Sequence, residues 1–124
     1  MKKLLIADDE LGIRRLVRMT LESDQYEIIE AADAQEALGM ARTHRPELVL
    51  LDVMMPKGTG FDVCRALKQD PETKDITVVM LTARSQKSDV AEGEVAGADD
   101  YFTKPFSPVN LVRKVDQILE NGHQ

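Results

Sequence analysis

Polar side chains that could do chemistry follow several apolar runs directly. Asp8 and Asp9 come after Leu-Leu-Ile-Ala, and Asp52 ends the run Leu-Val-Leu-Leu. Thr82 follows Val-Val-Met-Leu, and Lys104 stands just past a short fifth run. Carboxylates bind hard metal ions, and together with a hydroxyl and an ammonium group they can handle a phosphoryl group. The residue types therefore point to metal-assisted phosphoryl chemistry.

Three carboxylates gathered at one place would repel one another. Two carboxylates ~5 Å apart repel by about 3 kcal/mol at an effective dielectric constant of about 20. Lys104 supplies one positive charge, which cannot neutralise three acids. A set of oxygen ligands without histidine or thiolate suits Mg²⁺. Asp52 stands alone after the most apolar run and is the better candidate acceptor, whereas the adjacent Asp8 and Asp9 are better suited to holding the ion.

Regular alternation of apolar runs and amphipathic segments predicts the elements that position these groups. We expect strands at residues 4–7, 26–31, 47–52, 76–81 and 99–103. We expect helices at residues 11–21, 34–41, 61–68, about 88–95 and 108–120. Such alternation is typical of a parallel sheet with helices on both faces. Ligands bind such sheets beyond the carboxyl ends of the strands, where all five polar groups fall.

Composition limits the class of protein. The 124 residues are 43% apolar and 31% charged, which fits one soluble globular domain. The single cysteine, Cys64, excludes an internal disulfide framework and a multi-cysteine metal site. A net charge of −6 argues against direct nucleic-acid binding. Apolar runs are far shorter than the ~18 residues of a membrane helix, and no signal-peptide pattern opens the chain, so we expect a cytoplasmic protein away from membranes.

Four segments together resemble the response-regulator receiver domain of bacterial two-component signalling. They are LLIADDE (residues 4–10), LVLLDVMMPKGTGFDV (48–63), VVMLTA (78–83) and GADDYFTKPFSP (97–108). The resemblance covers essentially the whole chain and implies one receiver domain over residues 1–124. It implies an α/β, doubly wound, five-stranded parallel sheet of order 2-1-3-4-5 with five helices, the flavodoxin-like arrangement.

The resemblance implies a role for each polar group. Asp52 would accept a phosphoryl group from the phosphohistidine of a histidine kinase. Asp8, Asp9 and Asp52 would hold Mg²⁺, with the backbone carbonyl of Met54 as a further ligand. Lys104 would pair with the phosphoryl oxygens, and its bond to the following proline is usually cis in this family. The domain would be a signalling switch rather than an enzyme, with only its own phosphorylation and dephosphorylation as chemistry.

Further positions of the family concern switching and phosphoryl lifetime. Thr82 would hydrogen-bond the new phosphoryl group, and Tyr101 would rotate inward behind it. The plainer alternatives are a threonine that caps a strand end and a core tyrosine. Met54 and Arg84 would flank the acyl phosphate and hinder the attacking water. Two exposed loop side chains without consequence are the alternative for this pair.

Phosphorylation would alter a surface formed by residues 88–95, 99–103 and 108–120. The partners implied are a histidine kinase or phosphotransfer protein, and a downstream protein target or an effector domain absent from this chain. A homodimer through the same surface, with Lys114 paired to Asp100 across it, is a further expectation. Arg14, Arg15 and Arg18 are either a solvated helix face or a docking site for the kinase. The alternative function is a phosphorylation-independent, receiver-like protein-binding module.

Overall fold

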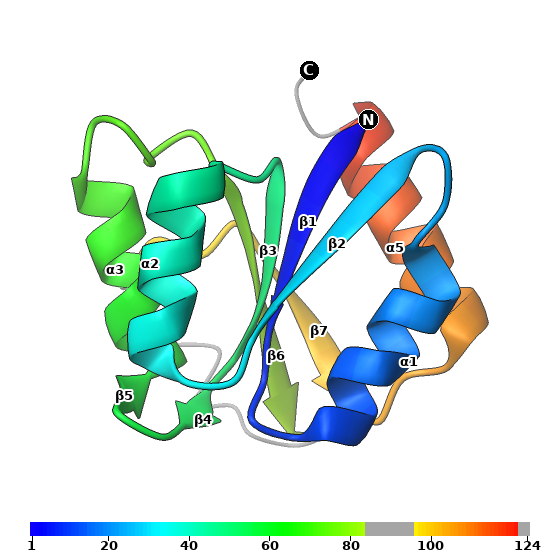
Figure 1. Cartoon of the computed structure of the whole chain (residues 1–124), viewed down its shortest axis with the longest axis horizontal. Helices are drawn as coiled ribbons and strands as arrows, with labels where there is room; N and C mark the ends of the chain where they lie inside the picture. Colours follow the sequence, from blue (N-terminus) through cyan, green and yellow to red (C-terminus); the bar gives the residue numbers. More distant parts are fainter. Residues whose placement is uncertain (84–95, 122–124) are drawn as a thin grey trace.

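The structure, a computed structural model, describes residues 1–83 and 96–121 (Figure 1). The elements in these residues are β1 (Lys2–Ala7), α1 (Leu11–Leu21), β2 (Tyr26–Ala31), α2 (Ala34–His44), β3 (Leu48–Asp52), β4 (Met54–Met55), β5 (Gly58–Thr59), α3 (Gly60–Gln69), β6 (Thr77–Ala83), β7 (Asp100–Lys104) and α5 (Pro108–Asn121). None of the helices among the described residues is both long enough and apolar enough to cross a membrane.

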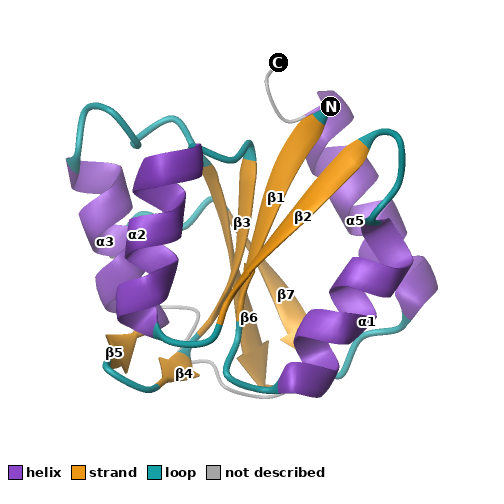
Figure 2. Ribbon diagram, in the orientation of Figure 1, coloured by secondary structure: helices purple, strands orange, loops and turns teal. Residues whose placement is uncertain are grey.

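Five parallel strands form the central sheet in the order β2-β1-β3-β6-β7. Helices α2 and α3 cover one face of this sheet, and α1 and α5 cover the other (Figure 2). The predicted doubly wound α/β class and its strand order are thereby confirmed, since β6 and β7 are the fourth and fifth strands of the prediction. The described residues contain four helices, and the fifth predicted helix, at about residues 88–95, lies outside them.

The apolar run of β1 explains why this strand lies near the middle of the sheet. Leu4 and Ile6 pack in the core cluster that also contains residues of α1 and α5, whereas Leu5 and Ala7 pack in the cluster on the α2 and α3 side. All four are at most 1% exposed. Alternate side chains of a strand point to opposite faces, so a continuous apolar run fits a strand covered by helices on both sides.

Element ends differ from the predictions by a few residues, and the two short strands β4 and β5 were not predicted. α2 extends to His44, three residues past its predicted end, and stops where Arg45 adopts a left-handed conformation with φ of 46°. Within the predicted loop 54–60, Met54 pairs with Thr59 in a short antiparallel ladder. The turn between the two short strands places Lys57 at φ 65° and Gly58 at φ 135°.

Gly60, the first residue of α3, lies tightly against β3. Its backbone N–H donates to the carbonyl of Val53 at 2.8 Å, and a Cβ atom here would overlap the backbone carbonyl of Asp52 and lie 3.1 Å from Cε of Met80. The close approach therefore requires glycine and fixes the backbone around Asp52.

Replacing Gly60 by alanine is expected to lower the free energy of unfolding by ~1–3 kcal/mol, because the methyl group has to displace backbone in a packed region. Gly39→Ala is the matched control. A Cβ atom at Gly39 would meet nothing within 4 Å, so that variant should gain up to about 1 kcal/mol from better helix propensity. Urea unfolding of both variants measures the difference, and a change of the same sign at both positions would contradict this account.

Candidate functional site

Three carboxylates and one ammonium group meet at the rim formed by the carboxyl ends of the strands. Asp8 and Asp9 follow β1, Asp52 ends β3, and Lys104 ends β7. A carboxylate oxygen from each of the three acids lies within 4.8 Å of the others. Asp8 is fully buried, Asp52 is 9% exposed, and Asp9 is exposed to solvent. The predicted convergence of these four residues is present in the structure.

Lys104 bridges two of the acids. Its Nζ atom donates to Oδ2 of Asp8 at 2.7 Å and to Oδ1 of Asp52 at 3.1 Å. Burial alone would lower the pKa of Lys104, but the hydrogen bonds and negative charges of Asp8 and Asp52 outweigh burial and raise that pKa. Lys104 therefore stays charged and is shared between two carboxylates. The Lys104–Pro105 peptide bond is cis.

Asp52 is the acid whose ionisation the site disfavours. Burial, followed by the negative charge of Asp8, raises the pKa of Asp52 from 3.8 to about 6, although the ammonium group of Lys104 acts in the opposite direction. At neutral pH the carboxylate is ionised despite this cost. Its charge is therefore poorly compensated, and a cation or a covalent bond at one oxygen would relieve the repulsion.

Asp8 is held from several sides by the polypeptide around it. Its backbone N–H donates to the carbonyl of Ala31 at the end of β2, at 3.1 Å. Its Oδ1 atom accepts the backbone N–H of Glu10 at 2.9 Å, while Lys104 binds Oδ2. A buried carboxylate with defined partners on both oxygens has a fixed orientation, which is what a metal ligand requires.

Two other residues singled out in the sequence, Thr82 and Met54, lie near this rim. Thr82 is 3% exposed and comes one residue after Leu81, which pairs with Asp52 between β3 and β6. Tyr101 on β7 is half-buried and packs against the core on the α2 and α3 side. The Met54 side chain is exposed. Arg84 lies outside the described residues, so its predicted effect on phosphoryl lifetime stays a prediction.

A surface pocket opens over the acidic rim. Its lining consists of Asp9, Glu10, Asp52, Val53, Met54, Leu81 and Lys104. The pocket thus joins two of the acids to the lysine and places Met54 at their edge. Carboxylate oxygens are the donors that Mg²⁺ prefers, so the pocket has the chemistry to hold a divalent ion next to a group that reacts at Asp52.

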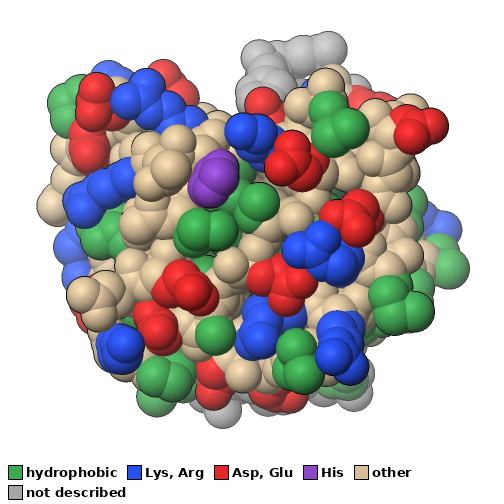
Figure 3. All heavy atoms as spheres, viewed as in Figure 1, with side chains coloured by type: hydrophobic (Ala, Val, Ile, Leu, Met, Phe, Trp, Pro, Cys, Tyr) green, Lys and Arg blue, Asp and Glu red, His purple; other side chains and the backbone are tan. Residues whose placement is uncertain are grey.

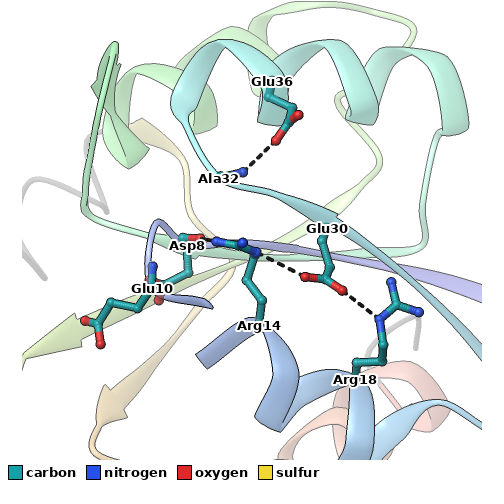
Figure 4. Close-up of polar contacts among 7 residues, drawn as sticks. All are labelled: Asp8, Glu10, Arg14, Arg18, Glu30, Ala32 and Glu36. Atoms are coloured by element: carbon teal, nitrogen blue, oxygen red, sulfur yellow. Dashed lines mark hydrogen bonds and ion pairs between the residues drawn. The ribbon is translucent and has the colours of Figure 1, made fainter. Parts of the chain in front are cut away.

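Two arginines of α1 are the main feature that the sequence did not predict at this site. Nη1 of Arg14 donates to the backbone carbonyl of Asp8 at 2.8 Å, and Arg14 and Arg18 both bind Glu30 of β2 (Figure 4). Basic and acidic side chains are intermixed on the face that contains α1 and β2 (Figure 3). The sequence gives one signal for this contact. Arg14 and Arg18 are four residues apart on α1, so they lie on one face of the helix, and the acid Glu30 is on the strand that follows.

Lys114 of α5 forms an ion pair with Asp100 of β7 within the chain, at 2.9 Å. The same two residues were expected to pair between two copies of the chain. The internal pair shows that Asp100 already has a cationic partner in the single chain. The homodimer itself stays a prediction.

Comparison with known proteins identifies the family. The family model described as "Response regulator receiver domain" matches residues 4–116. The phosphate regulon transcriptional regulatory protein PhoB of Pseudomonas aeruginosa is 42% identical over 118 residues, which cover 95% of this chain and 52% of PhoB. The alkaline phosphatase synthesis transcriptional regulatory protein PhoP of Bacillus subtilis is 44% identical over 121 residues, covering 98% of this chain and 50% of PhoP.

A solved structure agrees with this assignment over nearly its full length. The chemotaxis response regulator CheY4 of Vibrio cholerae superposes with a TM-score of 0.88 at 35% identity, covering 95% of this chain and 98% of CheY4. The chain spans about half the length of PhoB and PhoP. Because the family model covers nearly the whole chain, this protein belongs to the response regulator receiver domains of two-component systems.

Proposed function

We propose that Asp52 accepts a phosphoryl group from the phosphohistidine of a histidine kinase or a phosphotransfer protein. The observation that carries the proposal is the acidic rim itself, in which a nearly buried carboxylate lies beside two further acids and a shared lysine. A stable core gains nothing from three acids clustered around one ammonium group, whereas a phosphoryl acceptor needs this combination.

The proposed step is an in-line displacement at phosphorus. A carboxylate oxygen of Asp52 attacks the phosphorus atom and forms the new O–P bond. The P–N bond breaks, and its electron pair returns to the ring nitrogen of the donor histidine. The Lys104 ammonium group, already within 3.1 Å of Asp52, donates a hydrogen bond to the oxygens that carry the incoming charge.

The donor set fits Mg²⁺. Asp8, Asp9 and Asp52 offer only oxygen ligands from a cluster in which ligand atoms lie within 4.8 Å of one another. These three carboxylates would hold the ion, together with the backbone carbonyl of Met54. When bound, Mg²⁺ supplies positive charge to the phosphoryl oxygens and offsets the repulsion among the acids.

We further propose that Thr82 and Tyr101 transmit the modification. Thr82 is buried near the end of β6, in register with Thr103, the residue before Lys104. Its hydroxyl would bond a phosphoryl oxygen, and the half-buried ring of Tyr101 would follow it inward. The change would reach the surface formed by β7, α5 and the predicted helix at about residues 88–95, which lies outside the described residues. Met54 at the pocket edge, with Arg84, would slow hydrolysis of the acyl phosphate.

Phosphorylation would take effect through the protein that the altered surface contacts. A receiver domain acts between a histidine kinase and a downstream effector. The output here would be either contact with a separate protein target or control of an attached effector domain. A homodimer through β7, α5 and the predicted helix at about residues 88–95, which lies outside the described residues, would fit either case.

Phosphorylation of Asp52 can be tested with a small phosphodonor. The wild-type chain incubated with acetyl phosphate and Mg²⁺ should gain ~80 Da, the mass of one phosphoryl group. The adduct should be absent from Asp52→Asn and from wild type in excess EDTA. Intact mass spectrometry measures this directly.

Asp75→Asn is the matched control for the same chemical change, because Asp75 is exposed and precedes the opposite end of β6. This variant should become phosphorylated like the wild type. An adduct that persists in Asp52→Asn would place the acceptor elsewhere. A folded wild type that never gains the adduct would favour the phosphorylation-independent binding module instead.

The acidic rim should also cost stability when no metal is bound. In EDTA at pH 7.5, Asp52→Asn is expected to raise the free energy of unfolding by ~1–3 kcal/mol, because the amide removes one charge from the cluster and can still accept from Lys104. Asp75→Asn should stay within about 0.5 kcal/mol of wild type.

The increase in the free energy of unfolding caused by Asp52→Asn should depend on pH with a defined sign. Because burial raises the folded-state pKa of Asp52 from 3.8 to about 6, the carboxyl group is protonated and harmless in both states below about pH 4. The destabilising effect of the ionised Asp52 carboxylate develops as the pH rises from about 4 to about 6, and it is fully present above about pH 6. The advantage of Asp52→Asn should therefore grow over that window in urea titrations. A gain that is independent of pH would contradict burial and charge repulsion as its cause.

A further inference from the structure

Asp8 and Asp9 lie where the chain leaves β1 for α1, and a side chain of α1 reaches into that corner. Nη1 of Arg14, one turn into α1, donates to the backbone carbonyl oxygen of Asp8 at 2.8 Å (Figure 4). The Arg14 side chain is only 15% exposed. This contact touches the backbone of the acidic pair and neither of its carboxylates.

Arg14 is itself held in place by β2. Its Nε atom donates to Oε1 of Glu30 at 3.0 Å, and Oε2 of Glu30 accepts from Nε of Arg18 at 2.6 Å. Burial alone would raise the pKa of Glu30, but the hydrogen bonds from Arg18 and Arg14 outweigh it and lower that pKa. Glu30 is thus an ionised anchor that fixes the Arg14 guanidinium in one orientation.

The carbonyl of Asp8 belongs to the peptide unit that joins Asp8 to Asp9. A peptide unit is planar, so fixing its oxygen also fixes the direction in which the Asp9 backbone continues. Asp8 has its own side-chain partners in Lys104 and Glu10, but Asp9 is exposed, so its direction depends on this peptide. The contact made by Arg14 therefore bears on the orientation of Asp9 more than on that of Asp8.

We propose that Arg14 is a positioning residue for the acidic pair, which orients the Asp8–Asp9 peptide so that both carboxylates face one Mg²⁺ ion. The proposal rests on the function proposed above, in which these acids hold the metal. Arg14 touches neither the metal nor the phosphoryl group and acts through the backbone.

The charge of Arg14 and its positioning role make opposite predictions. A guanidinium beside an acidic cluster repels Mg²⁺, so if charge were its only effect, removing it would tighten metal binding. If Arg14 orients the peptide, removing it should weaken metal binding, and loss of such supporting hydrogen bonds costs about tenfold or more in metal affinity. The sign of the change separates the two.

The test is isothermal titration calorimetry of the metal-free full chain with MgCl₂, without a phosphodonor. We expect Arg14→Ala to raise the Mg²⁺ dissociation constant about tenfold. Arg15→Ala, which removes the same charge from an exposed neighbouring position, should bind like the wild type. Arg14→Lys, with one nitrogen for two acceptors, should fall between the wild type and Arg14→Ala.

A second measurement needs no metal. The backbone N–H of Glu10 donates to Asp8, so its hydrogen-exchange rate reports how well the corner is ordered. Arg14→Ala should exchange this proton faster than Arg15→Ala does, while thermal unfolding confirms that both variants are folded. If Arg14→Ala does not fold, Arg14→Lys alone decides, and a dissociation constant equal to that of Arg15→Ala would overturn the proposal.

Failure of this inference and failure of the proposed function look different. A wild type that neither binds Mg²⁺ nor accepts phosphate from acetyl phosphate would end the function, and the inference with it. The other case is that the wild type and Arg15→Ala bind Mg²⁺ and accept phosphate from acetyl phosphate. If Arg14→Ala then binds Mg²⁺ as tightly as they do, or more tightly, only the positioning role of Arg14 is wrong.

Discussion

Repulsion among the carboxylates of Asp8, Asp9 and Asp52 is a cost that the rest of this domain has to offset. Two of these acids share the ammonium group of Lys104, and the third faces solvent. Hydrophobic packing on both faces of the sheet has to outweigh the cost of holding them together. The tight approach of Gly60 to β3 and the contacts around Asp8 keep the carboxylates from moving apart. Under the proposed function, a site that cannot relax in this way would keep its affinity for a cation and for a phosphoryl group.

The parallel sheet is what makes such a site possible. Its five strands end at one rim. The carboxyl ends of β1, β3 and β7 therefore bring residues that are distant in sequence within a few ångströms of one another. The core below the rim is formed by apolar side chains that need no polar partners, such as Leu5 and Leu50. The polar groups of the rim and the apolar groups that stabilise the fold below it therefore belong to different residues.

The sequence alone was sufficient for the features that depend on local pattern. The continuous apolar run before Asp8 predicts a buried parallel strand, and acids directly after such strands must meet at one rim. The two hydrogen bonds of Lys104 could not be predicted, because they depend on the twist of the sheet and on one rotamer. The contacts of Arg14 with Glu30 and with the carbonyl of Asp8 could not be predicted either, because a basic residue at this position of α1 fits a solvated helix face equally well. The Met54–Thr59 ladder was missed because two-residue strands leave no periodicity.

A titration of the isotope-labelled, metal-free chain with Mg²⁺, followed by amide NMR, is the direct test of whether Asp8, Asp9 and Asp52 form one metal site. A magnesium site at the acidic rim predicts a saturable change at one ion per chain, with the largest amide shifts at residues 8–10, 52–54 and 104. Amide shifts that do not saturate at millimolar Mg²⁺, or that centre on another part of the sheet, would contradict it.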